Sequence, residues 1–175
     1  MIIDTHTHLD GIEFKDDIQD VVQRAKGVGV SKVFVPAIDL SSIESMNNVC
    51  QQFPDFAYPM IGLHPEEVKA NYKEVLEKMK ETLLASSKYI AVGEVGLDFY
   101  WSREFEKEQL EAFEEQVKWS IETRLPLMIH CRKAQNEMVK ILKKYQSQLP
   151  GGVFHCFTGN EKEAAELLSF NNFVL

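Results

Sequence analysis

The sequence predicts an α/β fold, a TIM-like (β/α) barrel of about six strand-helix units followed by the start of a seventh strand. Short apolar runs rich in β-branched residues alternate with amphipathic segments, and no hairpin signal lies between them. Polar residues that can bind metal follow the ends of most runs. The runs expected to be strands cover residues 2–4, 33–38, 57–63, 89–95, 126–130, 153–155 and 172–175.

The segments between these runs are predicted to be helices. Apolar residues recur there at intervals of three and four, as in a helix with one buried face. Two capping patterns mark helix starts, Ser41 with Glu44 and Asn160 with Glu163. The apolar stripes consist of Ile18, Val21, Val22 and Ala25 in one segment and of Leu110, Phe113, Val117 and Ile121 in another.

Strands joined by helices fit two architectures, a doubly wound open sheet and a closed barrel. An open sheet gathers polar residues only beside its switch point, whereas the carboxyl ends of all barrel strands meet at one mouth. Here polar residues follow five different runs, which favours the barrel. They are His8, His64, Glu94 with Asp98, His130 and His155.

The composition is typical of a globular cytoplasmic protein. With 175 residues, 45% of them hydrophobic and 26% charged, we expect a single domain over residues 1–175. No apolar run approaches the ~18 residues of a membrane span, and no basic leader follows Met1, so we expect neither membrane association nor secretion. The net charge of -8 disfavours a plain DNA-binding module with a basic surface.

The cysteines are few and odd in number, three in all, which fits reduced thiols better than a disulfide framework. Two of them, Cys131 and Cys156, directly follow His130 and His155. Since neighbouring side chains on a strand face opposite ways, we expect both thiols to point away from the histidines and to pack in the interior.

Candidate metal ligands begin at the first strand, where His6 and His8 lie two residues apart and are expected to share one face. This pair alone is weak evidence. The fourth run adds Glu94, flanked by Gly93 and Gly96 in an apolar stretch without a basic partner. Because a buried unpaired carboxylate is costly, a bound cation is the simplest counter-charge, and the glycines indicate a close backbone approach.

The fifth and sixth strands bring His130 and His155 to the same mouth. Four imidazoles and one carboxylate exceed what a tetrahedral zinc ion needs, so we expect two divalent ions bridged by Glu94. Nitrogen-rich ligation favours zinc, manganese or iron over calcium, and magnesium, manganese and zinc are the ions to test. Such a pair activates water for ester or phosphodiester hydrolysis, with Glu94 as the catalytic residue.

Three further residues are expected to contact substrate, and each has a second interpretation. Arg132 suits a phosphate or a salt bridge at the barrel rim. His64 hydrogen-bonds substrate or caps the segment after it. Asp98 steers a ligand or caps a turn. The aromatic run at residues 99–101 offers a stacking surface for a base or packs within a loop.

Five ordered motifs resemble those of the TatD-family deoxyribonucleases, members of the amidohydrolase superfamily. The resemblance runs from the first predicted strand to the sixth. It implies a (β/α)8 barrel and metal-dependent hydrolysis of DNA phosphodiester bonds, often 3′ to 5′, in the cytoplasm. The motifs are His6-Thr7-His8, Gly62-Leu63-His64-Pro65, Gly93-Glu94-Val95-Gly96-Leu97-Asp98, His130-Cys131-Arg132 and His155-Cys156-Phe157.

Carried over residue by residue, the resemblance implies that His6, His8 and Glu94 hold one ion and that Glu94, His130 and His155 hold the other. The implied partners are single-stranded DNA ends or small phosphodiesters. Members also use an aspartate of the eighth strand as a ligand and base. The sequence stops before that strand, so we expect an incomplete barrel, impaired activity, and aggregation, a swapped dimer or a partner at the open edges.

Two other functions fit the same pattern. Another amidohydrolase, acting on a lactone, amide or phosphoester, would often bridge its metals with a carbamylated lysine, and this sequence has Glu94 there instead. A metal-binding but catalytically inactive form would follow from the missing barrel closure.

Overall fold

The computed structural model describes residues 1–175 and contains one parallel sheet of seven strands in the order β1-β2-β3-β4-β5-β6-β7. Each strand pairs with the next along the chain, so the sheet has no switch point. This order confirms the predicted α/β barrel class over the doubly wound sheet. The strands are β1 (Ile2–Asp4), β2 (Val30–Pro36), β3 (Ala57–Ile61), β4 (Ala91–Asp98), β5 (Leu127–Arg132), β6 (Gly152–Phe154) and β7 (Phe173–Val174).

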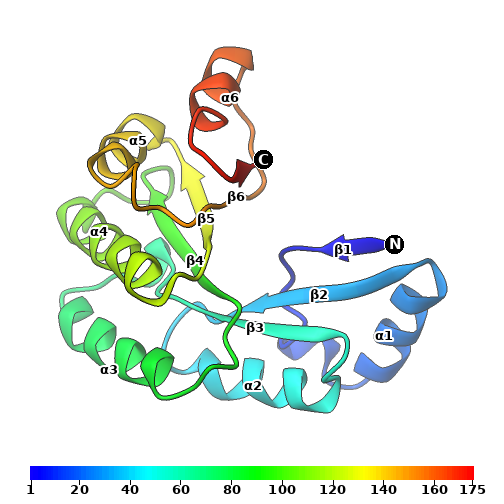
Figure 1. The fold of residues 1–175 in the computed structure, drawn as a ribbon. Coiled ribbons are helices and arrows are strands. Elements are labelled where there is room, and N and C mark those ends of the chain that lie inside the picture. The colour runs from blue at the N-terminus through cyan, green and yellow to red at the C-terminus, as the bar shows by residue number, and fades with distance from the viewer.

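Helices connect successive strands and follow the outside of the curved sheet, as Figure 1 shows. None of them is long and apolar enough to cross a membrane. The helices are α1 (Ile18–Gly27), α2 (Ser42–Gln52), α3 (Tyr72–Leu84), α4 (Glu106–Thr123), α5 (Gln135–Lys144) and α6 (Glu161–Leu167), with short 3-10 turns η1 (Ile12–Phe14) and η2 (Pro65–Glu67).

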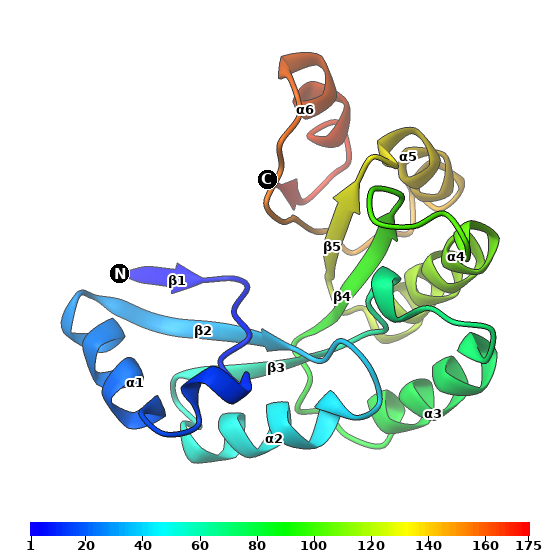
Figure 2. The same cartoon turned by 180° about the vertical axis from the view of Figure 1, so that it is seen from behind.

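The sheet does not close on itself. Strands β1 and β7 each pair with one neighbour, and they form the two edges visible from behind in Figure 2. Ile2 and Ile3 of β1 are 53% and 45% exposed. The barrel is therefore incomplete, as expected.

The main hydrophobic core lies between the sheet and the outer helices and contains 38 buried residues. A smaller apolar cluster of Met60, Ala91 and Met128 comes from three adjacent strands. Met128 and His130 are two residues apart on β5, so they share one face of the sheet. That face carries the polar residues at its carboxyl end.

The helix starts agree with one of the two capping predictions. Asn160 caps α6 in a capping box with Glu163, as predicted. The prediction for Ser41 is wrong, because this residue already has helical backbone angles and its side chain caps nothing. Asp39 takes that place, and its Oδ1 accepts a hydrogen bond of 2.8 Å from the backbone N–H of Ser42.

The two cysteines that follow histidines differ. Cys131 packs against the main core, as predicted, and burial raises the pKa of its thiol to about 12. Cys156 is exposed, so the prediction of interior packing is wrong there. Because β6 ends at Phe154, the strand alternation on which that prediction rested no longer applies at Cys156.

Candidate metal centre

Five histidines surround the carboxylate of Glu94 at the carboxyl end of the sheet. Glu94 is 2% exposed and lies on β4, in which every residue is buried. Its oxygens lie 2.7 Å from Nε2 of His6 and 2.8 Å from Nε2 of His155. The whole group, called the histidine cluster below, consists of His6, His8, His64, His130 and His155.

The two carboxylate oxygens of Glu94 face different members of the histidine cluster. Oε2 lies 2.7 Å from His6 and 3.7 Å from Nε2 of His8. Oε1 lies 2.8 Å from His155 and 3.2 Å from Nδ1 of His130. A carboxylate with one oxygen toward each side is able to bridge two cations.

Three groups of three side chains hold their donor atoms close enough to bind one ion, and one of these groups combines histidines from both sides of Glu94. His6, Glu94 and His155 form one group whose donor atoms lie within 4.8 Å of one another, and His64, Glu94 and His130 form another. The rings of His6 and His155 stack with centroids 4.0 Å apart. The structure thus brings every expected ligand to one place, while it pairs His6 with His155 more closely than with His8.

His130 lies between two carboxylates, and this arrangement calls for a cation. Its Nε2 lies 2.8 Å from Oδ2 of Asp98, and its Nδ1 faces Oε1 of Glu94 at 3.2 Å. When Nε2 of a neutral imidazole donates to Asp98, Nδ1 carries a lone pair. A lone pair facing a carboxylate oxygen is favourable only with a proton or a metal ion between them.

The electrostatics of the site agree with that requirement. Burial acts to raise the pKa of Glu94, but hydrogen bonds from His130, His155 and His6 outweigh it and hold the pKa far below its usual range. Burial likewise acts to lower the pKa of His130, and its bonds to Glu94 and Asp98 reverse the shift and raise it. Positive charge is therefore stabilised beside Glu94, and either a protonated imidazole or a bound divalent cation can supply it.

His64 is held differently from the other members. Its Nδ1 accepts a hydrogen bond of 3.2 Å from the backbone N–H of Glu66, so the neutral ring carries its proton on Nε2. That N–H lies 3.6 Å from Oε1 of Glu94, longer than a hydrogen bond. His64 caps η2, which confirms one of the two interpretations drawn from the sequence. Its Nε2–H is still a donor that faces the cavity.

His6 and His8 are not positioned by the side-chain alternation along a strand that the sequence predicted. Strand β1 ends at Asp4, so both histidines lie in the loop after it and strand alternation does not orient them. The loop is held by a hydrogen bond of 3.0 Å from the backbone N–H of Thr7 to Phe34 O on β2. This hydrogen bond to β2 therefore holds the loop that carries both histidines against the sheet.

The glycines beside Glu94 allow β4 and β5 to approach closely, as their presence in the sequence indicated. Gly96 has φ of +147°, and a Cβ there would collide with the backbone carbonyl of His130. A Cβ on Gly93 would collide with the side chain of Met128. Both glycines therefore bring Glu94 and His130 together.

Two buried glutamines of α4 also position the site, and the sequence analysis missed them. Oε1 of Gln109 accepts from the backbone N–H of Asp98 at 2.9 Å, and its Nε2 donates to Asp98 O at 3.1 Å. Gln116 does the same for Leu63, at 2.6 and 3.2 Å. The two glutamines are seven residues apart and therefore lie on one face of the helix. This spacing was the signal in the sequence from which their shared role could have been predicted.

Asp98 and Arg132, both expected to contact substrate, are placed in contrasting ways. Asp98 is 1% exposed, and besides His130 its carboxylate accepts from the backbone N–H of Tyr100 at 2.9 Å. It thus caps the turn after β4 and holds His130. Arg132 forms no salt bridge, and its guanidinium lies 3.7 Å from the ring centroid of Tyr100.

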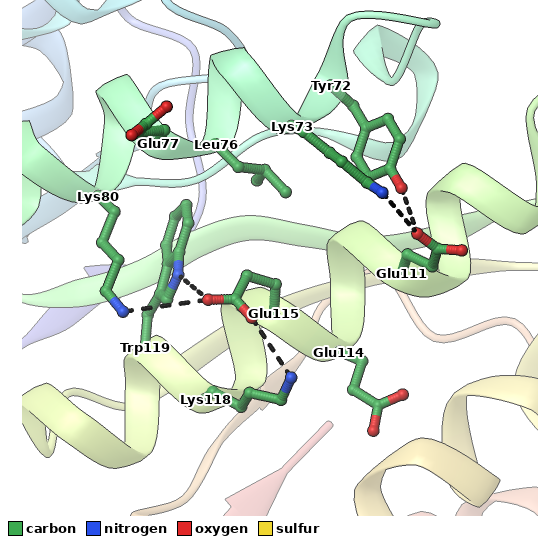
Figure 3. A pocket seen from close by; sticks show the side chains of 10 residues that line it. All are labelled: Tyr72, Lys73, Leu76, Glu77, Lys80, Glu111, Glu114, Glu115, Lys118 and Trp119. Atoms are coloured by element: carbon green, nitrogen blue, oxygen red, sulfur yellow. Dashed lines mark hydrogen bonds and ion pairs between the residues drawn. The ribbon is translucent and has the colours of Figure 1, made fainter.

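A cavity of about 400 Å³ opens over Glu94, lined mainly by the histidine cluster with Glu66 and Glu67. A larger cavity, about 530 Å³, lies on the outer surface between α3 and α4 (Figure 3). Its three lysines are paired with glutamates, for example Lys118 with Glu115 at 3.3 Å. It has no set of donors like that around Glu94, so we place the functional site at the strand ends.

Known proteins resemble this chain over nearly its whole length. A family model described as "TatD related DNase" matches residues 3–174. The "Uncharacterized metal-dependent hydrolase YabD" of Bacillus subtilis is 35% identical over 174 residues, which cover 99% of this chain and 68% of that protein. The "3'-5' ssDNA/RNA exonuclease TatD" of Edwardsiella piscicida is 31% identical, with 99% of this chain and 66% of that protein covered.

A solved structure is also similar. The TatD homologue YJJV from Escherichia coli superposes with a TM-score of 0.89 at 29% identity, over 98% of this chain and 66% of that one. The chain spans 62% to 68% of the length of the curated relatives it matches.

Proposed function

Since the chain belongs to the TatD-related DNase family and so to the metal-dependent hydrolases, we propose that it hydrolyses phosphodiester bonds of single-stranded DNA from the 3′ end. The proposal includes two divalent cations, magnesium, manganese or zinc, held by His6, His8, Glu94, His130 and His155. The observation that carries it is the meeting of five histidines around the buried carboxylate of Glu94, whose two oxygens face different histidines.

In this proposal the residues of the chain have separate roles. When bound, the cations lower the pKa of a water molecule and polarise the phosphoryl oxygen. Glu94 would supply the negative charge that holds them. Asp98 fixes the tautomer of His130 so that Nδ1 faces the cavity. The Nε2–H of His64, which lies beyond hydrogen-bond distance of Glu94, is free to donate to a phosphate oxygen.

The proposal is tested by incubating the chain with Mn²⁺, Mg²⁺ or Zn²⁺ and a short single-stranded oligonucleotide labelled at either end. Digestion from the 3′ end releases the 3′ label as a mononucleotide and shortens the 5′-labelled strand in a ladder. An RNA strand of the same sequence and bis(p-nitrophenyl) phosphate extend the test to the other phosphodiesters. Intact substrates with all three ions would reject the proposed function.

The matched control is Glu94→Gln, which keeps the shape of the side chain and removes its charge. We expect this variant to lose hydrolysis and to bind fewer metal ions per chain, measured by elemental analysis after removal of free metal. If the variant kept both its activity and its metal, Glu94 would not be the bridging ligand.

A further inference from the structure

A second cavity lies beside the histidine cluster and shares His155 with it. It has a volume of about 450 Å³ and lies between the β5-α5 and β6-α6 loops. Its wall includes Tyr100, Arg132, Lys133 and Phe157. The shared histidine makes it a continuation of the space above Glu94, so that a chain-like ligand at the metal centre extends into it.

The cations of this second cavity are not used by the protein itself. The guanidinium of Arg132 lies over aromatic rings, 3.7 Å from the centroid of Tyr100 and 5.2 Å from that of Trp101, and it forms no ion pair or hydrogen bond. Lys133 is exposed and likewise unpaired. An oriented guanidinium with all its N–H donors free is suited to a phosphate group.

Charge is distributed unevenly around the histidine cluster. On the β3 side, Glu66 and Glu67 line the cavity over Glu94, and the one nearby cation, Lys69, lies 3.9 Å from Glu67. On the β5 side, Arg132 and Lys133 attract a polyanion. The second cavity also contains Glu137 and Glu163, of which Glu163 is occupied in capping α6 through a bond of 2.8 Å to the backbone N–H of Asn160. The cations without an ion-pair partner, Arg132 and Lys133, therefore lie on the β5 side of the histidine cluster.

The aromatic residues at this end of β4 are divided between core and solvent. Phe99 is 6% exposed and packs in the core. Tyr100 and Trp101 are 49% and 65% exposed, and their rings meet edge to face with centroids 4.9 Å apart. Arg132 lies over both rings but nearer to Tyr100, so Trp101, the more exposed of the two, is the ring more open to a base. Base stacking on an exposed indole is favourable for every base.

We propose that Tyr100, Trp101 and Arg132 form a nucleotide-binding platform beside the metal centre. Arg132, oriented by Tyr100, binds a backbone phosphate of the single strand, and Trp101 stacks on a neighbouring base. The inference rests on the proposed function for its ligand. It adds a binding site for a nucleotide that flanks the bond to be cleaved, on the side of β5.

The platform is tested by binding to the metal-free protein in EDTA, where no hydrolysis occurs. The probes are dye-labelled oligothymidylate and an abasic strand of the same length, followed by fluorescence anisotropy. Trp101→Ala is expected to weaken oligothymidylate binding about tenfold and to leave the abasic strand unaffected. Trp101→Phe, which keeps an aromatic face, should restore most of the loss.

Arg132→Met is expected to weaken both strands alike, about tenfold, and to reduce the slope of log K against log salt by about one. The matched control is Arg24→Met, because Arg24 is an exposed arginine on α1 paired with Asp17. Intrinsic fluorescence gives a second readout: the chain has two tryptophans, and Trp119 is 1% exposed, so quenching by oligothymidylate reports Trp101.

The outcomes separate this inference from the proposed function. Unchanged binding by both Trp101→Ala and Arg132→Met would overturn the platform, even if the metal-loaded chain cleaves DNA. Reduced binding by these variants would support the platform even if the loaded chain cleaves nothing, a result that would reject the proposed function alone.

Discussion

The side-chain amide of Gln109 brackets the backbone of Asp98, accepting from its N–H at 2.9 Å and donating to its carbonyl at 3.1 Å. The amide thus pairs with both backbone groups of the last residue of β4. Gln116 repeats the arrangement at Leu63, next to His64. One helix, α4, therefore fixes two of the loops that carry the site.

Replacing Gln109 with leucine is expected to destabilise the fold. Gln109 is 4% exposed, so the change leaves a buried N–H and a buried C=O of Asp98 without partners, at a cost of about 2–4 kcal/mol. Urea denaturation followed by circular dichroism measures it. Gln23→Leu, at an exposed position of α1, is the control and should change stability by less than about 0.5 kcal/mol. Equal losses of stability at both positions would show that the hydrogen bonds between Gln109 and Asp98 contribute nothing.

Asp98→Asn is expected to weaken metal binding without unfolding the protein. An amide can no longer act only as an acceptor, so it ceases to hold the His130 proton on Nε2. Loss of such a supporting carboxylate typically costs about 10–100-fold in metal affinity. Isothermal titration with Mn²⁺ measures the affinity, and ¹⁵N NMR of the imidazole reports the tautomer. Wild-type affinity with an altered tautomer would contradict this role of Asp98.

Gly96→Ala is expected to prevent correct folding or to destabilise it by more than about 2 kcal/mol, because its φ of +147° and the nearby carbonyl of His130 leave no room for a Cβ. Gly27→Ala is the control, since a Cβ there meets no atom within 4 Å at the end of α1. That change should be neutral or stabilising by up to about 1 kcal/mol. Thermal unfolding and the yield of folded protein compare the two variants.

The free energy of unfolding at acidic pH is expected to depend on Asp39. Although partial burial opposes it, hydrogen bonds from Ser42 and Ser41 lower the pKa of Asp39 in the folded state below its ordinary value of 3.8. The ionised carboxylate therefore stabilises the fold above that value, and the contribution disappears as pH falls through the lower, folded-state pKa.

Asp39→Asn removes this titration while keeping an acceptor at the start of α2. Near neutral pH the variant should be less stable by at most about 1 kcal/mol, a limit that solvent screening reduces further. As pH falls below ~4 the difference from the wild type should shrink toward zero. Urea midpoints across this range measure it, and a constant difference would show that Asp39 stabilises α2 through geometry alone.

Much of the fold followed from the sequence because its signals are local. Strand and helix periods, with single helices joining successive strands, imply a parallel sheet in chain order, and seven such strands are present. Boundaries shifted where tertiary contacts extend an element. Strand β2 begins at Val30 and not at residue 33, since Ile2 and Ile3 of β1 pair with Val30 and Lys32.

The sequence by itself determined that Glu94 and the five histidines lie at or near the carboxyl ends of strands, and hence that they meet, because parallel strands bring these ends to one edge. Only the tertiary structure decided which groups touch. His6 stacks on His155, and Asp98 lies behind His130. Such contacts depend on how the sheet curves and how loops leave it, and residue spacing along a strand carries no information about either.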